Sequence, residues 1–214
     1  LLQQLDISGC LVVADALNCQ KETASVIVSG KGDYLLSVKE NHPSLMRDIR
    51  DYIQDDSLRV SMSSQTIQEK NRDRIETRTA FVSHNIDWLP QKEQWLHLAC
   101  IGAIHTQFQT QAGKSSQWHY YLSSRQLSAD ELLHHARMEW AVESMHWLLD
   151  VHFEEDYLRV ANKSIQENLN LLRKFSLSLI KQYKSKTDSK RPLSKLMFDC
   201  LLDCSMILRI LFQN

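Results

Sequence analysis

The hydrophobic and polar positions in the first quarter of the chain predict strands and helices in turn. The apolar, β-branched run Cys10–Ala16 predicts a buried strand, and Tyr34–Val38 predicts a second one. Helices are expected over Cys19–Ser29 and over residues 43–55. Because the connections are short, this order of strand, helix, strand and helix predicts an α/β fold with a parallel sheet.

Two charged residues directly follow these predicted strands. Asp15 lies at the carboxyl end of the first strand, and Lys39 lies at that of the second. Functional side chains of parallel sheets gather at this edge, so the two residues form a candidate site. Each residue also has an ordinary explanation, since Asp15 suits a helix N-cap and Lys39 suits a solvated surface.

The pattern changes after Asp56. Few helix signals occur between residues 58 and 124, and three segments alternate as strands do: residues 74–82, 96–108 and 118–122. A turn is expected at Gly113–Ser116, between the last two of these segments. We expect this region to be a mostly β insertion that continues or flanks the sheet.

The last part of the chain has the 3.6-residue period of helices. Ser128, with Glu131 three residues later, predicts a capping box at the start of a helix that reaches Glu143. A second amphipathic helix is expected over residues 164–183, and a last one over residues 193–212. The polar segment 184–192 is expected to separate them and to be mobile.

The segment EWAVESMHWLLDVHFEED, residues 139–156, places an unusual row of groups on one helix face. Glu139, Glu143, His146 and Asp150 are spaced as i, i+4, i+7 and i+11. Such a row is either a solvated acidic face or one that faces a metal ion. If the fold brings Glu143 to Asp15, the two carboxylates repel, and Mg²⁺ or Mn²⁺ would relieve that repulsion.

The overall charge does not indicate a nucleic-acid partner, but its distribution is uneven. The formal net charge is −1, whereas residues 159–195 are mostly basic and contain only Glu167 and Asp188 as acids. A basic surface helix and tail is the plain alternative to a DNA-binding role.

The five cysteines show no disulfide framework and predict reduced thiols in a cytosolic protein. The sequence contains no apolar run long enough to predict a membrane span.

Five segments occur in the same order as in one known family. They are VVADALNCQKETASVIVSGKGDYLLSVKEN (residues 12–41), RIETR (74–78), YYLSS (120–124), ARMEWAVESMHWLLDVHFEED (136–156) and ENLNLLRKFSLSLIKQ (167–182). This set resembles DDE-type insertion-sequence transposases, in the group that includes the H-repeat-associated (ISAs-like) proteins. The resemblance covers nearly all of the chain, and its ordered set of motifs is far more specific than any single one.

The resemblance implies an RNase H-like catalytic core in which two aspartates and a glutamate bind two Mg²⁺ ions. Asp15 matches the second aspartate and Glu143 matches the glutamate, so both are expected to be catalytic metal ligands. Arg137 matches an arginine that precedes the glutamate and contacts DNA phosphate. Lys39, Arg74, Arg173 and Lys174 are further expected DNA contacts, while Trp147 either stacks on a base or packs.

The sequence departs from the family pattern in three places. The first aspartate has no counterpart except Asp6, which is too close to the next strand to serve. Glu139 stands where many relatives have histidine, and Arg72 with Asp73 stands where they often have His-Gly. We therefore expect a carboxyl-terminal fragment or truncated copy with four parts: a partial RNase H-like core that lacks its first strands (1–57), a β-rich insertion (58–127), the catalytic-glutamate helix (128–160) and C-terminal helices (161–214).

The expected function is that of a DNA transposase. Such an enzyme cuts phosphodiesters at transposon ends and joins the freed 3′-OH to target DNA by two-metal catalysis. Two alternatives stay open: an inactive DNA-binding remnant, and a nuclease that cuts without joining. The expected partners are the DNA of the transposon ends and of the target. A homodimer is a further possible assembly, and no membrane partner is expected. The expected location is the cytoplasm of a bacterium, at the nucleoid.

Overall fold

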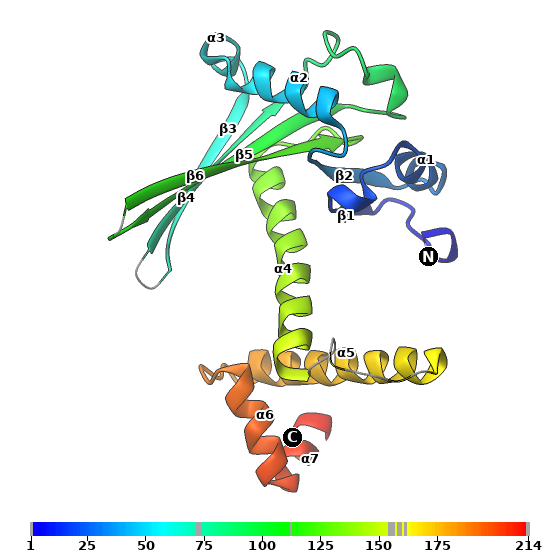
Figure 1. Ribbon diagram of the computed structural model, residues 1–214, viewed down its shortest axis with the longest axis vertical. Coiled ribbons are helices and arrows are strands. Elements are labelled where there is room, and N and C mark those ends of the chain that lie inside the picture. The colour runs from blue at the N-terminus through cyan, green and yellow to red at the C-terminus, as the bar shows by residue number, and fades with distance from the viewer. Residues whose placement is uncertain are drawn as a thin grey trace. The chain divides into compact units, whose positions relative to one another are not determined.

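The computed structural model of the 214-residue chain describes residues 2–71, 74–111, 113–153, 157, 160 and 162–212. The side chains of Gln3, Asn71, Glu139 and residues 141–143 lie outside this description. The chain forms two compact units, Leu1–Trp140 and Ala141–Asn214 (Figure 1). The four domain boundaries drawn from the sequence stay a prediction.

A six-stranded sheet forms the centre of the first unit. Its strand order is β1-β2-β6-β5-β4-β3, and only the β1–β2 pair is parallel. The α/β class is confirmed, and so is the parallel pairing expected for the first two strands. The strands of the later β-rich region continue the same sheet antiparallel. The strands are β1 (Leu11–Ala14), β2 (Asp33–Val38), β3 (Ser63–Asn71), β4 (Arg74–Ser83), β5 (Cys100–Thr110) and β6 (Gly113–Ser123).

Helices α1 (Lys21–Ser29), α2 (Pro43–Gln54) and the short α3 (Asp56–Arg59) also belong to this unit. Single 3₁₀ turns occur at Leu2–Gln4, Ala16–Asn18 and Lys92–Gln94. Helix α1 begins two residues later than predicted, because Ala16–Asn18 first forms its own 3₁₀ turn. Helix α2 begins at Pro43, whose fixed φ and missing N–H suit the first turn.

Each face of the sheet has its own hydrophobic core, because successive side chains of a strand point to opposite faces. On one face Leu45, Ile49 and Ile53 of α2 pack over buried residues that include Leu36 and Ile101. On the other face Leu132, Leu133 and Ala136 of α4 (Ala129–Phe153) pack over residues that include Leu35, Ala80, Ile104 and Tyr121. Figure 1 shows α2 and the first turns of α4 on opposite sides of the sheet.

The predicted capping box at the start of α4 is confirmed. The backbone N–H of Ser128 donates to Glu131 Oε2 at 2.8 Å, and the N–H of Glu131 donates to Ser128 Oγ at 3.2 Å. These two reciprocal bonds satisfy N–H groups that a helix start otherwise leaves without partners.

Helices α5 (Lys163–Lys186), α6 (Leu193–Leu202) and α7 (Cys204–Phe212) belong to the second unit, where Ile180, Leu196 and Ile210 form a small core. The expectation of one last helix over residues 193–212 is wrong. The helix is interrupted at Asp203, between α6 and α7. The Asp203 carboxylate accepts hydrogen bonds from the backbone N–H and the hydroxyl of Ser205 at 2.8 and 2.7 Å. Asp203 thereby starts a new helix in the manner of an N-cap.

All five cysteines are free thiols, as their irregular spacing predicted. Burial raises the pKa of the Cys19 thiol to about 12, so this group stays protonated at neutral pH. None of the described helices is long and apolar enough to cross a membrane.

The packing of β5 against α4 makes a specific prediction at Gly102. A Cβ added there would lie 2.6 Å from Leu132 Cδ2 and 3.2 Å from the carbonyl oxygen of Phe81. We expect Gly102→Ala to lower the free energy of unfolding by about 1–3 kcal/mol, measured by urea denaturation, because overpacking forces neighbouring atoms to move. In a Leu132→Ala background the same change should cost much less. An equal cost in both backgrounds would contradict this packing.

Candidate functional site

A cavity of about 600 Å³ lies at the carboxyl ends of β1 and β2. Asp15 and Lys39 both line it, so the structure brings these two predicted site residues together. Other lining residues come from the loop after β2 and from β6, and they include Glu40, Asn41, Trp118, His119 and Tyr120. Strand β6 takes part because it pairs with β2 on the side away from β1.

Side chains of the loop after β2 hold the loop after β1 in place. The Asn41 Nδ2 group donates to the carbonyl oxygen of Ala16 at 2.7 Å. His42 Nε2 lies 2.7 Å from the carbonyl oxygen of Cys19, within hydrogen-bond distance. These contacts fix the two strand ends relative to each other and thereby define the cavity beside Asp15.

Asp15 has the N-cap role that was one of its two sequence interpretations. Its Oδ1 accepts hydrogen bonds from the backbone N–H and the side-chain Nδ2 of Asn18, at 3.2 and 2.8 Å. The side chain is exposed to solvent. Because these bonds use only one carboxylate oxygen, capping does not prevent the other oxygen from binding a cation.

Lys39 is exposed at the same cavity. The Lys39 ammonium carries three donors and a full charge, which suits a phosphate oxygen that enters the cavity. Glu40 follows it directly and also lines the cavity, so the rim carries both signs of charge.

The described residues supply only part of a metal site. Within the described ranges no three His, Cys, Asp or Glu side chains form a group that could hold a metal ion. A carboxylate such as Asp15 is the donor type that Mg²⁺ and Mn²⁺ prefer. The side chains of Glu143 and Glu139 lie outside the described residues, as do Arg72, Asp73 and Asp156, while His146 and Asp150 are exposed on α4.

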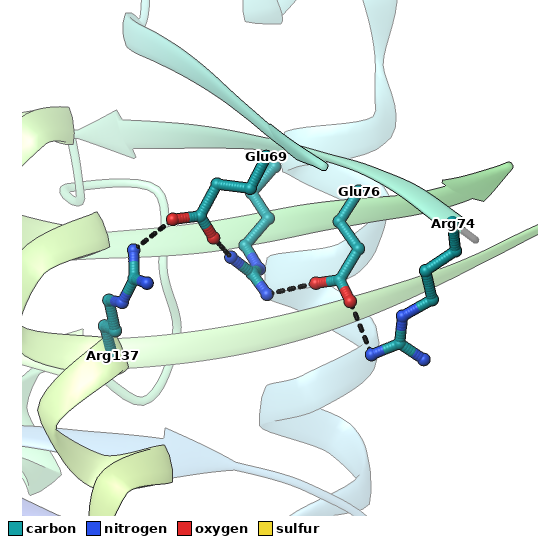
Figure 2. Close-up of polar contacts among 5 residues, drawn as sticks. Glu69, Arg74, Glu76 and Arg137 are labelled. Atoms are coloured by element: carbon teal, nitrogen blue, oxygen red, sulfur yellow. Dashed lines mark hydrogen bonds and ion pairs between the residues drawn. The ribbon is translucent and has the colours of Figure 1, made fainter. Parts of the chain in front are cut away.

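Two of the predicted DNA contacts, Arg74 and Arg137, lie at the ends of an ion-pair chain (Figure 2). Arg137 Nη1 lies 2.6 Å from Glu69 Oε1, and Arg78 Nη1 lies 2.6 Å from Glu69 Oε2. Arg78 also pairs with Glu76, whose other carboxylate oxygen pairs with Arg74. We call these five residues the arginine–glutamate network.

The arginine–glutamate network joins β3, β4 and the first half of α4. The Glu76 side chain is only 3% exposed, so its charge requires close cationic partners. Arg78 also lies over the Trp140 ring, 5.2 Å from its centre, and Arg74 lies over the Phe108 ring at 5.2 Å. Arg74 and Arg137 are therefore already engaged with carboxylates, although each remains about half exposed.

Sequence reasoning missed Glu69, Glu76 and Arg78. The alternation of Glu76 and Arg78 on β4 is visible in the sequence, but their pairing with Glu69 depends on the β3–β4 register. That register places Glu69 opposite Glu76. Two carboxylates at opposite positions would repel, and Arg78 between them removes that cost.

The two remaining DNA candidates lie in the second unit, on α5. Lys174 is exposed, whereas Arg173 is half-buried. The Nη1 atom of Arg173 is buried and has no hydrogen-bond partner among the described residues. Trp147, on α4, is 59% exposed, and its ring lies edge-on to that of His152 at 6.0 Å.

The sequence resembles several curated transposases of Escherichia coli. It is 32% identical to "Putative transposase YncI" of strain O157:H7 over 190 aligned residues. The alignment covers 86% of this chain and 49% of that protein. It is 29% identical to "H repeat-associated putative transposase YhhI" of strain K12 over 187 aligned residues. This alignment covers 84% of this chain and 50% of that protein. The names of these relatives support the assignment of this chain to a transposase family. A shorter match, to "H repeat-associated putative transposase YbfD" of strain K12, is 37% identical over 83 residues, which are 38% of this chain and 33% of that protein.

The chain spans about half the length of the first relatives that it matches. No family model matches the sequence. No solved structure matches the fold significantly.

The arginine–glutamate network predicts the titration of Glu69. Hydrogen bonds from Arg137 and then from Arg78 hold the pKa of Glu69 below its ordinary value. Arg137→Gln should therefore raise the pKa of Glu69, measured by NMR titration of the side-chain carboxyl carbon. Because the folded pKa is lower than the unfolded one, this group stabilises the fold above the unfolded pKa, and that stabilisation is lost as pH falls through the folded pKa.

Glu131 is the internal control for this titration. A backbone hydrogen bond from Ser128 lowers its pKa, and Arg137 takes no part in that interaction. The pKa of Glu131 should stay the same in Arg137→Gln. An unchanged Glu69 pKa in the variant would show that the Arg137–Glu69 ion pair does not form in solution.

Proposed function

We propose that the protein acts in DNA transposition by cutting phosphodiesters at transposon ends and joining the freed 3′-OH to target DNA. The observation that supports this most directly is the placement of Asp15 beside Lys39 in one cavity, in a chain similar to curated transposases. A carboxylate for a cation and an ammonium for a phosphate are the groups that phosphodiester chemistry needs at one place.

We further propose that β1, α1 and β2 are the later part of an RNase H-like core. In such a core the strand that carries the first catalytic aspartate lies beside the strand that carries the second. In the described part of the chain, β1 pairs with β2 on one side and has no partner strand on the other. That free edge is the position where a strand with the first aspartate would pair.

The proposed chemistry assigns separate tasks to the chain's own residues. Asp15 and Glu143 would supply carboxylate oxygens to Mg²⁺ or Mn²⁺, and the bound cation would supply charge stabilisation for the attacking and leaving oxygens. Lys39 would hold a non-bridging phosphate oxygen of the strand being cut. In the first step water would attack phosphorus, and the P–O bond to the 3′ oxygen would break to free a 3′-OH. In the second step that 3′-OH would attack a phosphorus of the target, whose own 3′ oxygen would leave as a hydroxyl, so one P–O bond forms as another breaks and no covalent bond to protein is needed.

A DNA-binding remnant that does not cut is the second candidate function. In this function basic residues such as Lys39 and Lys174 would hold DNA phosphates without metal-dependent cutting. A nuclease that cuts without joining is a third. Gel analysis of products separates all three: joined strands indicate a transposase, cut but unjoined strands a nuclease, and salt-sensitive binding without cutting a remnant.

Substitution of the glutamate tests the proposed catalytic role. In the intact protein, Glu143→Gln should abolish Mg²⁺-dependent cleavage while DNA affinity stays within about 3-fold, since a neutral amide binds cations poorly but adds no bulk. Asp15→Asn should behave in the same way. Glu167→Gln on α5, a surface carboxylate that is 66% exposed, is the control and should cut normally. Normal cleavage by Glu143→Gln would show that the glutamate assignment is wrong.

A further inference from the structure

The outer halves of β3–β6 present one sheet face that contains no carboxylate. The strand register aligns three rows of side chains on this face. We call it the polar face, and its rows are Thr66, Thr79, His105 and Trp118; then Gln68, Thr77, Gln107 and Ser116; then Lys70, Ile75, Gln109 and Lys114. In Figure 1 the strands run on beyond α2 at this end of the sheet.

The acidic side chains of these strand segments all lie on the sheet face opposite to the polar face. Residues 66–70, 75–79, 105–109 and 114–118 contain two acids, Glu69 and Glu76. Both point to the opposite face, where the arginine–glutamate network neutralises them. The polar face carries Lys70 and Lys114 together with hydroxyl and amide groups, so its charge is positive.

The polar face offers hydrogen-bond donors at an exposed surface. Two internal contacts order part of it: Thr66 Oγ1 lies 3.0 Å from Thr79 Oγ1, and Gln68 Nε2 donates to Thr77 Oγ1 at 3.1 Å. Beside them is a groove of about 340 Å³, whose lining includes Gln107, Lys114 and Ser116. All three of these side chains are exposed.

Trp118 links the polar face to the cavity that contains Asp15 and Lys39. Its ring lies flat against that of His105, with the ring centres 4.2 Å apart and an angle of 7° between the planes. The same tryptophan lines the cavity. The cavity and the polar face therefore share Trp118, and a strand of DNA held at Lys39 would reach the polar face across this side chain.

We infer that the polar face binds the sugar–phosphate backbone of the DNA that flanks the phosphodiester held in the cavity. The inference rests on the proposed function. Phosphate oxygens carry negative charge and accept hydrogen bonds, so a surface with hydroxyl, amide and ammonium groups and no carboxylate is complementary to them. Arg74 and Arg137 of the opposite face are less suited, because Glu76 and Glu69 already pair with them.

Two neighbouring residues of β6 allow a matched test. Ser116 and Gln117 are consecutive and exposed, and they point to opposite faces of the sheet. Fluorescence anisotropy of the full chain with a labelled DNA duplex of arbitrary sequence gives the affinity, since backbone contacts carry no sequence information. Ser116→Glu should weaken binding about 10-fold or more through a carboxylate placed against phosphate, and Gln117→Glu should weaken it less than about 3-fold.

A second pair of changes keeps the inference testable if Ser116→Glu disturbs the fold, which thermal unfolding would show. In the double variant Lys70→Gln and Lys114→Gln, the plot of log affinity against log salt should become shallower by about 2, because each lysine that is replaced neutralises about one phosphate. The double variant Lys31→Gln and Lys92→Gln, at positions outside both the polar face and the cavity, is the control of equal charge change. Its plot should stay as steep as that of the wild-type chain.

The outcomes separate failure of the inference from failure of the proposed function. Equal losses of affinity from Ser116→Glu and Gln117→Glu would overturn the inference, because only the net charge would then matter. A greater loss from Gln117→Glu would also overturn it and place the DNA on the face of the arginine–glutamate network. A wild-type chain that binds no duplex would overturn the proposed function together with the inference.

Discussion

The parallel pairing of β1 with β2 determines where the candidate chemistry lies. Parallel strands end at the same edge of a sheet, so Asp15 after β1 and Lys39 after β2 come to one cavity although a helix separates them in sequence. Asn41 and His42 hold the two strand ends together. Because β2 also pairs with β6, the same edge receives Trp118 from a distant part of the chain.

The alternation of side chains along β3–β6 has a second consequence, which is the separation of charge between the two faces. One face buries Glu76 and therefore needs Arg78 and Arg74, since an unpaired buried carboxylate is far more costly than a paired one. With Glu69 and Arg137 included, these ion pairs join the strands to the beginning of α4. The acids of the outer strands are thus confined to one face, and the other face is free of them.

Much of the local structure could be predicted from the sequence, whereas the long-range pairing could not. The first two strands, helix α2 and the Ser128–Glu131 capping box depend on near neighbours, and each formed as expected. The mixed sheet and the arginine–glutamate network depend on registers between distant strands, which no local pattern specifies. The interruption of the last helix at Asp203 was not predicted, because apolar residues continue at helical spacing on both sides of it. For the site, the sequence placed Asp15 and Lys39 at strand ends, but the contribution of Trp118 depends on the β2–β6 pairing.

Iron-directed cleavage of the protein backbone tests most directly the proposal that Asp15 and Glu143 bind the same divalent cations. Fe²⁺ in place of Mg²⁺, with ascorbate and peroxide, produces hydroxyl radicals that cut the chain near the bound ion. If the two carboxylates share the site in the intact protein, the cuts fall near residues 15 and 143, and excess Mg²⁺ suppresses both together. Cuts at one of these positions without the other, or cuts that Mg²⁺ does not suppress, would contradict the shared metal site.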